Sequence, residues 1–221
     1  MKITHELIID TLDEFQFHEH LNISLQNITD ENLLNKLPSQ WRDLFSGKKN
    51  TNQFIESSWY PLAKSLPTTI DLLKKKVKKI ALLEKQESRG FSLLYLFLQN
   101  DSLHIRIANP PAFELPELFT EINYDIKKLY QVHNGFIDLI SKDAGFLPLE
   151  NIEIFTNQET GGNSFLKIFG NGPNSLGFDL EDNNKTPYII WGADDDIEIV
   201  DDFWIELDEW IAADIEDFDD A

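Results

Sequence analysis

Carboxylates are the side chains whose number and crowding could do chemistry in this chain. Seventeen of them lie within residues 179–221, where Lys185 is the only basic residue. Seventeen negative charges and one positive charge leave −16 in this segment, out of −20 for the whole chain. Crowded carboxylates can work as a paired acid and base, hold a hard cation, or present a negative field to a basic molecule.

The acidic segment also carries many large apolar residues, which a disordered acidic tail lacks. They include Ile189, Ile190, Ile197, Ile199, Val200, Phe203, Trp204, Leu207, Trp210 and Ile211. We therefore expect a folded surface whose field attracts a basic partner. The predicted electrostatic contacts are Asp194, Asp195, Asp196, Glu198, Asp201 and Asp202, and Trp191 is the predicted aromatic anchor.

Catalytic and metal-binding patterns are weaker. Among 39 acids no pair stands out, and no nucleophile-elbow or Ser-His-Asp pattern accompanies them, so we predict no enzyme and no cofactor. His18 and His20 could share one face of a strand but have no third ligand at a usable spacing. Residues 179–184 lack the central glycine of a calcium loop, so we predict no metal site. His133 is expected to be a cation at a helix end.

Composition limits the compartment and the partners. The chain has 221 residues, of which 42% are hydrophobic, and it has no cysteine. No signal peptide is evident, and the longest apolar run, residues 91–98, is too short to cross a bilayer. These features predict a cytoplasmic protein with no membrane contact. A net charge of −20 argues against nucleic-acid binding, where basic patches supply the affinity.

Hydrophobic periodicity indicates helices and strands in both halves of the chain. Residues 1–65 are mostly helical in pattern, and the clearest helix is expected over 68–88, with lysines on its solvent face. A hairpin is predicted from 91–99 and 103–107, before a break at 109–111. Further along, the pattern predicts a helix over 115–132 ended by Gly135, strands at 166–169, 176–180 and 188–191, and a last helix capped by Asp201 or Asp202.

The predicted fold is therefore α+β, with a mostly antiparallel sheet flanked by helices and a mainly helical N-terminal extension that ends in a hairpin. The predicted units are residues 1–110, residues 111–215 and a frayed acidic tail over 216–221.

Several short motifs recur here in a characteristic order. They are the Leu-Pro of residues 113–116, the Leu-Tyr at 129–130 followed by Asn134-Gly135, the Leu-Pro-Leu within 145–152, a glycine-turn hairpin over 169–180, and the closing aromatic helix from Phe203 to Ile211. Over residues 113–213 this order resembles the SUKH superfamily, named for fungal cell-wall-synthesis regulators and a bacterial Sec-associated protein and rich in bacterial toxin-immunity proteins. The family's usual serine before the closing helix is Asp202 here.

The resemblance implies an α+β binding module without catalytic residues, whose groove or sheet face recognises a protein. In the immunity members that protein is a cognate toxin, as in toxin–antitoxin pairs and contact-dependent inhibition. We therefore expect an immunity protein that neutralises a basic toxin, for example a nuclease, through its acidic face. The alternative is a regulatory or scaffolding protein of the cell-wall-regulator type with no toxin partner. A homodimer, formed when the lysines of residues 74–85 meet the acidic segment, is also open.

Overall fold

The computed structural model describes residues 2–15, 21–25, 27–85, 90–100, 102–142, 144–157, 163–192 and 196–216. Within them the fold is α+β, with a helical N-terminal part and an antiparallel sheet of eleven strands. The helices are α1 (His5–Glu14), α2 (Glu31–Lys36), α3 (Ser39–Phe45), α4 (Thr51–Ser58), α5 (Pro67–Lys76), α6 (Lys127–Val132) and α7 (Phe203–Glu216), with 3-10 turns η1 (Tyr60–Leu62), η2 (Glu117–Glu121) and η3 (Leu149–Asn151).

The sheet runs through both halves of the chain. Its order is β1 (Leu21–Ser24), β2 (Val77–Lys85), β3 (Gly90–Gln99), β4 (Ser102–Asn109), β5 (Asn134–Asp138), β6 (Gly145–Phe146), β8 (Asn163–Asn171), β9 (Asn174–Asp179), β10 (Pro187–Trp191) and β11 (Asp196–Ile199). Strand β7 (Glu153–Asn157) pairs with β8 beside this path. Strand β4 pairs with β5, so the sheet is continuous across the predicted boundary at residue 110.

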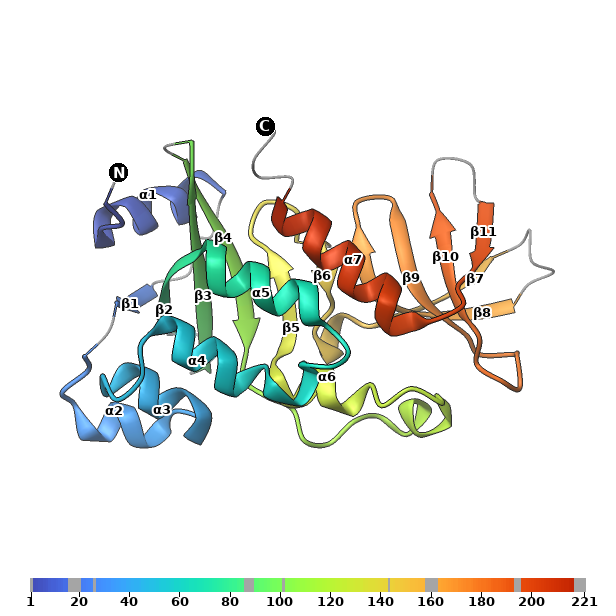
Figure 1. The fold of residues 1–221 in the computed structure, drawn as a ribbon, viewed down its shortest axis with the longest axis horizontal. Coiled ribbons are helices and arrows are strands. Elements are labelled where there is room, and N and C mark those ends of the chain that lie inside the picture. The colour runs from blue at the N-terminus through green and yellow to red at the C-terminus, as the bar shows by residue number, and fades with distance from the viewer. Residues whose placement is uncertain are drawn as a thin grey trace.

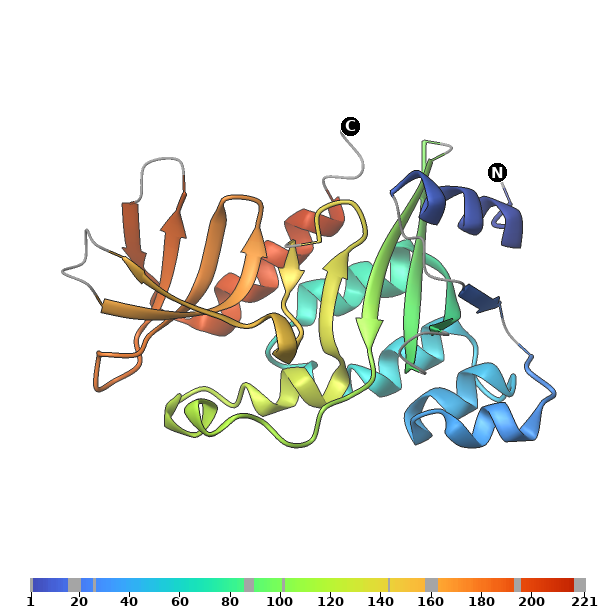
Figure 2. The same ribbon diagram turned by 180° about the vertical axis from the view of Figure 1, so that it is seen from behind.

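Helices cover both faces of the first half of the sheet. Figure 1 shows α4 and α5 across one face of this half, with α7 continuing the helical layer over the middle of the sheet, and Figure 2 shows α1 on the other face. Strand β3 alternates accordingly, since Leu93, Tyr95 and Phe97 join the core under α4, α5 and α7. Leu94 and Leu96 face the core under α1. A strand buried on both faces reads as a continuous apolar run, which explains the sequence of β3.

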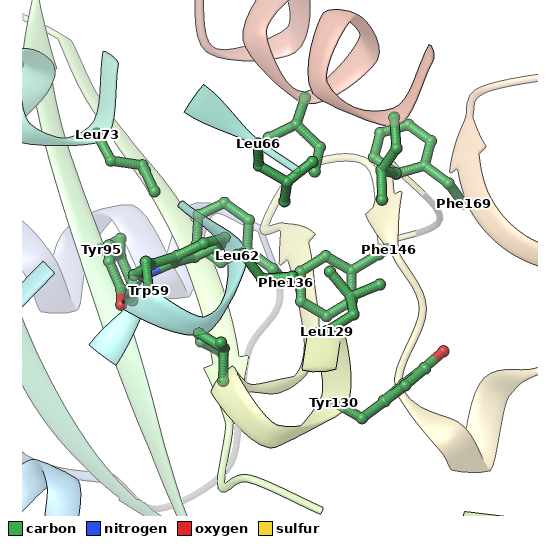
Figure 3. Close-up of a cluster of buried hydrophobic side chains, with 14 of the residues drawn as sticks. Trp59, Leu62, Leu66, Leu73, Tyr95, Leu129, Tyr130, Phe136, Phe146 and Phe169 are labelled. Carbon is green, nitrogen blue, oxygen red and sulfur yellow. Dashed lines mark hydrogen bonds between the residues drawn. The ribbon is translucent and has the colours of Figure 1, made fainter. Parts of the chain in front are cut away.

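The main core is aromatic-rich and closely interlocked. Figure 3 shows Trp59, Tyr95 and Phe136 meeting beneath α4 and α5, with Phe146 and Phe169 continuing the cluster towards α7. The Phe136 ring lies edge-on to Trp59 and to Tyr95, at centroid distances of 5.4 and 5.1 Å. Such edge-to-face contacts add stability beyond the buried area. They join the strand after α6 to the helices of the N-terminal half.

Helix α7 lies along this core through one apolar stripe. Phe203, Leu207, Ile211 and Ile215 recur every four residues and are fully buried. The Asp202 side chain accepts a hydrogen bond of 2.8 Å from the Trp204 amide, which confirms the predicted N-terminal cap.

Two carboxylates of α7, Asp208 and the partly buried Asp214, fix this helix to the N-terminal half. Asp208 accepts hydrogen bonds from the backbone amides of Thr68 and Thr69, at 3.0 and 2.8 Å, at the start of α5. Near the other end of α7, Asp214 forms an ion pair with Arg106 of β4, whose side chain is fully buried. Part of the acidic segment is therefore structural.

The predicted helix over 68–88 is wrong beyond Lys76. Helix α5 ends there and the chain continues as β2 from Val77. Ile80 and Leu82 face the main core while Ala81 and Leu83 face the core under α1. A short apolar run of this kind fits a buried strand as well as a helix. The lysines predicted on one helix face are thus divided between α5 and β2.

The predicted helix over 115–132 is also wrong in its middle. The structure has η2, then extended backbone at Ile122, then α6. The Asn123 side chain donates a hydrogen bond of 2.9 Å to the Asn184 carbonyl, which holds this segment against the turn before β10. The predicted hairpin of 91–99 and 103–107 is confirmed as β3 and β4, and the three predicted strands at 166–169, 176–180 and 188–191 fall in β8, β9 and β10.

Candidate protein-binding face

The last hairpin and the start of α7 form one face of the molecule. In the β10–β11 hairpin, Tyr188 lies opposite Ile199 and Trp191 lies opposite Asp196. Val200 leaves the hairpin with its amide bonded to the Pro187 carbonyl at 3.0 Å and its side chain buried. Strand β11 is the last strand of the sheet order (Figure 1), so its outer edge has no neighbouring strand among the described residues.

Two tryptophans orient two glutamates on this face. The Trp191 indole donates a hydrogen bond of 3.1 Å to the Glu198 carboxylate across the hairpin. The Trp210 indole of α7 donates to Glu206, one turn earlier on the same helix. The two indole rings lie 6.0 Å apart between centroids. The hairpin and the helix are therefore connected through aromatic contact, and each ring directs a carboxylate.

Backbone packing helps to place Trp191. A Cβ atom on the adjacent Gly192 would lie 2.3 Å from the Pro173 carbonyl oxygen, so a larger residue there would push the strand end outward. The Gly192 amide donates a hydrogen bond of 3.2 Å to the Asn174 side chain at the start of β9. Close backbone approach at Gly192 thus holds the end of β10 against the β8–β9 turn.

The carboxylates of this face are not neutralised by the described cations. Among the described residues, none of Asp196, Glu198, Asp201, Asp202 and Glu206 forms an ion pair with a lysine, arginine or histidine. Partial burial raises the pKa of Glu206, and the charges of Glu209 and Glu198 raise it further, while the hydrogen bond from Trp210 opposes the shift. The raised pKa therefore reflects burial first, and the neighbouring carboxylates add to it.

A shallow hollow of about 340 Å³ lies between β11 and α7. Its walls are apolar side chains, and carboxylates stand among them: Ile189, Ile199, Val200 and Ile205, with Glu198, Asp201, Asp202 and Glu206. Ile199 is 64% exposed and Ile205 is 60% exposed, which is unusual for isoleucine. We call Trp191, Asp196, Glu198, Ile199, Asp201, Asp202, Ile205 and Glu206 the acidic face.

The structure brings most of the predicted contact residues together. Glu198, Asp201 and Asp202 line the hollow, and Asp196 stands opposite Trp191, which is 37% exposed. Asp194 and Asp195 lie outside the described residues. Whether any of these residues contacts a partner stays a prediction.

Sequence reasoning did not select Ile205, Glu206 or Trp210 for this face. A helical projection could have found Ile205, because it falls off the four-residue stripe that begins at Phe203 and is exposed. The contact of Trp210 with Trp191 depends on how α7 crosses the sheet and has no local sequence signal.

The expectation that His133 is a cation at a helix end is wrong. His133 is fully buried, and the Tyr95 hydroxyl lies 2.7 Å from its Nε2 atom. Trp59 can only donate, and it donates to the Tyr95 oxygen at 3.1 Å, so the Tyr95 proton is directed to a neutral imidazole. Burial lowers the pKa of His133 to about 3, although a hydrogen bond with the Asn109 backbone opposes the shift.

The rest of the described chain offers no clearer site. No group of three or more histidine or acidic side chains there could hold a metal ion. His18 and His20 lie outside the described residues. No described helix combines the length and the apolar character needed to traverse a bilayer.

Comparison of the chain with protein-family models, with curated proteins and with solved structures finds no match. The resemblance to the SUKH superfamily over residues 113–213 therefore stays a prediction based on motif order.

Proposed function

We propose that this chain is a non-enzymatic binding protein whose acidic face engages a basic protein. The observation that carries the proposal is the combination of exposed apolar side chains and unneutralised carboxylates around one hollow. Ile199 and Ile205 are exposed beside Glu198, Asp201 and Asp202. Lysine and arginine side chains match this pattern, because their alkyl stems cover apolar surface while their charged ends reach carboxylates.

The function that we favour is that of a cytoplasmic immunity protein. Such a protein would neutralise a cognate basic toxin, for example a nuclease, by covering the toxin's active surface. The resemblance to the SUKH superfamily supports this choice, and the charge of −20 suits fast capture of a basic partner. Trp191 supplies a rigid aromatic anchor at the border of the carboxylates.

The first test is co-expression with the protein encoded beside this chain, followed by affinity purification and a toxicity assay. The association rate of the purified pair is then measured at low and high ionic strength. Electrostatic steering predicts a fall of roughly 10- to 100-fold as salt screens the acidic face. An association rate that ignores ionic strength would contradict steering.

Charge reversal at one position tests whether the contact lies on the acidic face. Glu198→Lys is expected to slow association and to weaken the complex by roughly 10-fold or more. Glu56→Lys makes the same charge change at an exposed site on α4 and serves as the matched control. Equal effects of the two variants would mean that only net charge matters and would remove the acidic face from the proposal.

The alternative is a regulatory or scaffolding protein with no toxin partner. Its motivating feature is the group of five lysines within residues 74–79, which lie where α5 passes into β2. In that case the acidic segment keeps the protein dispersed in solution, and co-expression yields neither capture nor protection from toxicity.

A further inference from the structure

A second hollow, on the opposite part of the molecule, has the reverse charge. It is a groove of about 720 Å³ between the α2–α3 corner and the segment that follows β4. Lys36 and Arg42 line it, and none of the described residues that line it is acidic. In a chain with 39 acids and 19 basic residues, this groove presents two cations and, among its described lining residues, no carboxylate.

The floor of the groove is rigid and apolar. It is formed by Leu37, Pro38, Phe91, Pro110, Pro111 and Phe113. The prolines restrict the backbone on both sides, so the groove exists before anything binds. Phe113 is 60% exposed, which leaves a large aromatic ring available at its border. An occupant with an apolar side chain would cover this ring and these prolines.

The two cations are held differently. The Arg42 guanidinium donates hydrogen bonds of 3.0 Å to the Leu37 carbonyl and 3.1 Å to the Asn35 carbonyl, at the C-terminal end of α2. A guanidinium has five N–H groups, so donors remain for a carboxylate. Lys36 is exposed beside it. Asp43, the acid next to Arg42 in sequence, forms its ion pairs with Lys48 and Lys49 instead.

We propose that this groove receives residues 217–221 of a second copy of the chain. This segment, Asp217-Phe218-Asp219-Asp220-Ala221, places one aromatic side chain among three carboxylates. Phe218 suits the floor of proline and phenylalanine, and the flanking aspartates suit Arg42 and Lys36. Five extended residues reach roughly 17 Å.

The occupant belongs to another copy because of where α7 ends. Figures 1 and 2 both show α7 ending towards the same end of β3 and β4 as the turn between these strands, whereas α2 and α3 lie towards the opposite ends. Two copies that exchange their last residues would form a closed two-fold dimer. Physiological salt shortens the range of repulsion between two strongly negative chains to about 8 Å, which permits this local contact. The inference is independent of the partner proposed for the acidic face.

The test measures the mass of the full chain by sedimentation or light scattering over a range of concentrations. The expected result is a dimer that is lost when residues 217–221 are deleted. Lys36→Glu is expected to weaken the dimer by roughly 10-fold or more, and Lys64→Glu, an exposed site outside the groove, is the matched control and should leave it unchanged. Arg42→Glu is a second groove variant, and circular dichroism checks that each variant is folded.

A labelled peptide of residues 216–221, EDFDDA, provides a direct probe of the groove. It should bind the deleted chain, and both Phe218→Ala in the peptide and Lys36→Glu in the protein should weaken binding. A chain that stays monomeric at every concentration overturns the proposal, even if the peptide binds. A dimer that survives the deletion or ignores both groove variants overturns it as well.

Discussion

The carboxylate of Asp208 on α7 accepts a hydrogen bond of 2.8 Å from the backbone amide of Thr69 at the start of α5. The residue before α5, Leu66, has no side chain that could cap the helix, so Asp208 supplies the cap from 139 residues away in sequence. One member of the acidic segment thereby stabilises a helix of the N-terminal half, because an anion is favourable at a helix N-terminus.

Replacing Asp208 with alanine should therefore lower the free energy of unfolding by about 2 kcal/mol, since the buried Thr69 amide and the partly buried Thr68 amide lose their acceptor. Urea denaturation followed by circular dichroism measures this change. Glu209→Ala removes an exposed carboxylate of the same helix and should alter stability by less than about 0.5 kcal/mol. Equal losses in the two variants would show that Asp208 has no special role as a cap.

Burial of His133 as a neutral imidazole should make the protein less stable in mild acid. Its pKa is about 3 in the folded chain and about 6.5 when unfolded, so the unfolded state binds more protons between these values. The contribution of His133 to the free energy of unfolding is complete above pH 6.5. It falls by about 1.4 kcal/mol for each pH unit below that value. Denaturation midpoints between pH 7.5 and about 5 measure the slope. His133→Gln should have a shallower slope in this range, and an unchanged slope would rule out His133 as the cause.

The unit predicted over residues 111–215 should not fold when produced alone. Without β4, the edge of β5 loses the partners that pair Ile107 with Ile137 and Ala108 with Phe136. Asp214 would also lose Arg106, leaving its carboxylate without the buried cation. Circular dichroism and proton NMR of the isolated segment are expected to show no cooperative unfolding. A sharp two-state transition would instead support an autonomous domain beginning at residue 111.

Trp191 should matter for partner binding more than for folding. In the complex of the chain with its basic partner, Trp191→Ala is expected to raise the dissociation constant roughly 30-fold, as for an aromatic anchor at an interface. Trp191→Phe keeps an aromatic ring but loses the donor to Glu198, so its effect should be intermediate. Tyr60→Ala is the control, because Tyr60 is 75% exposed on η1. Calorimetric titration measures all three, and an unaffected Trp191→Ala complex would exclude this anchor.

Local signals predicted the parts of the fold that depend on neighbours in sequence. The apolar residues from Phe203 to Ile211 and the cap at Asp202 identified α7, and two strand-like apolar runs separated by a short polar turn identified the hairpin of β3 and β4. The change from α5 to β2 at Val77 was not predicted, because the apolar run after Val77 fits a helix as well as a strand. In the folded protein this run forms a strand because a hydrophobic core lies on each face of the sheet.

The candidate face was only partly predictable for the same reason. The carboxylates and Trp191 were visible as a concentration of charge with aromatic residues. The hollow between Ile199 and Ile205 required knowledge of where β11 lies against α7, and β11 has only four residues. Likewise, the structural acids Asp208 and Asp214 cannot be told from the exposed ones by sequence, because their partners Thr69 and Arg106 are remote.

The terminal position of β11 in the sheet affects whether this edge pairs with a second copy of the chain or with a different protein. An exposed strand edge can pair with the same edge of another molecule and so extend the sheet without limit. If a second copy placed its own β11 alongside, antiparallel and with Ile197 opposite Ile197, Asp196 of each chain would face Glu198 of the other, and like charges directly opposite one another repel. The carboxylates that we expect to attract a basic protein therefore also disfavour pairing with the β11 edge of a second copy.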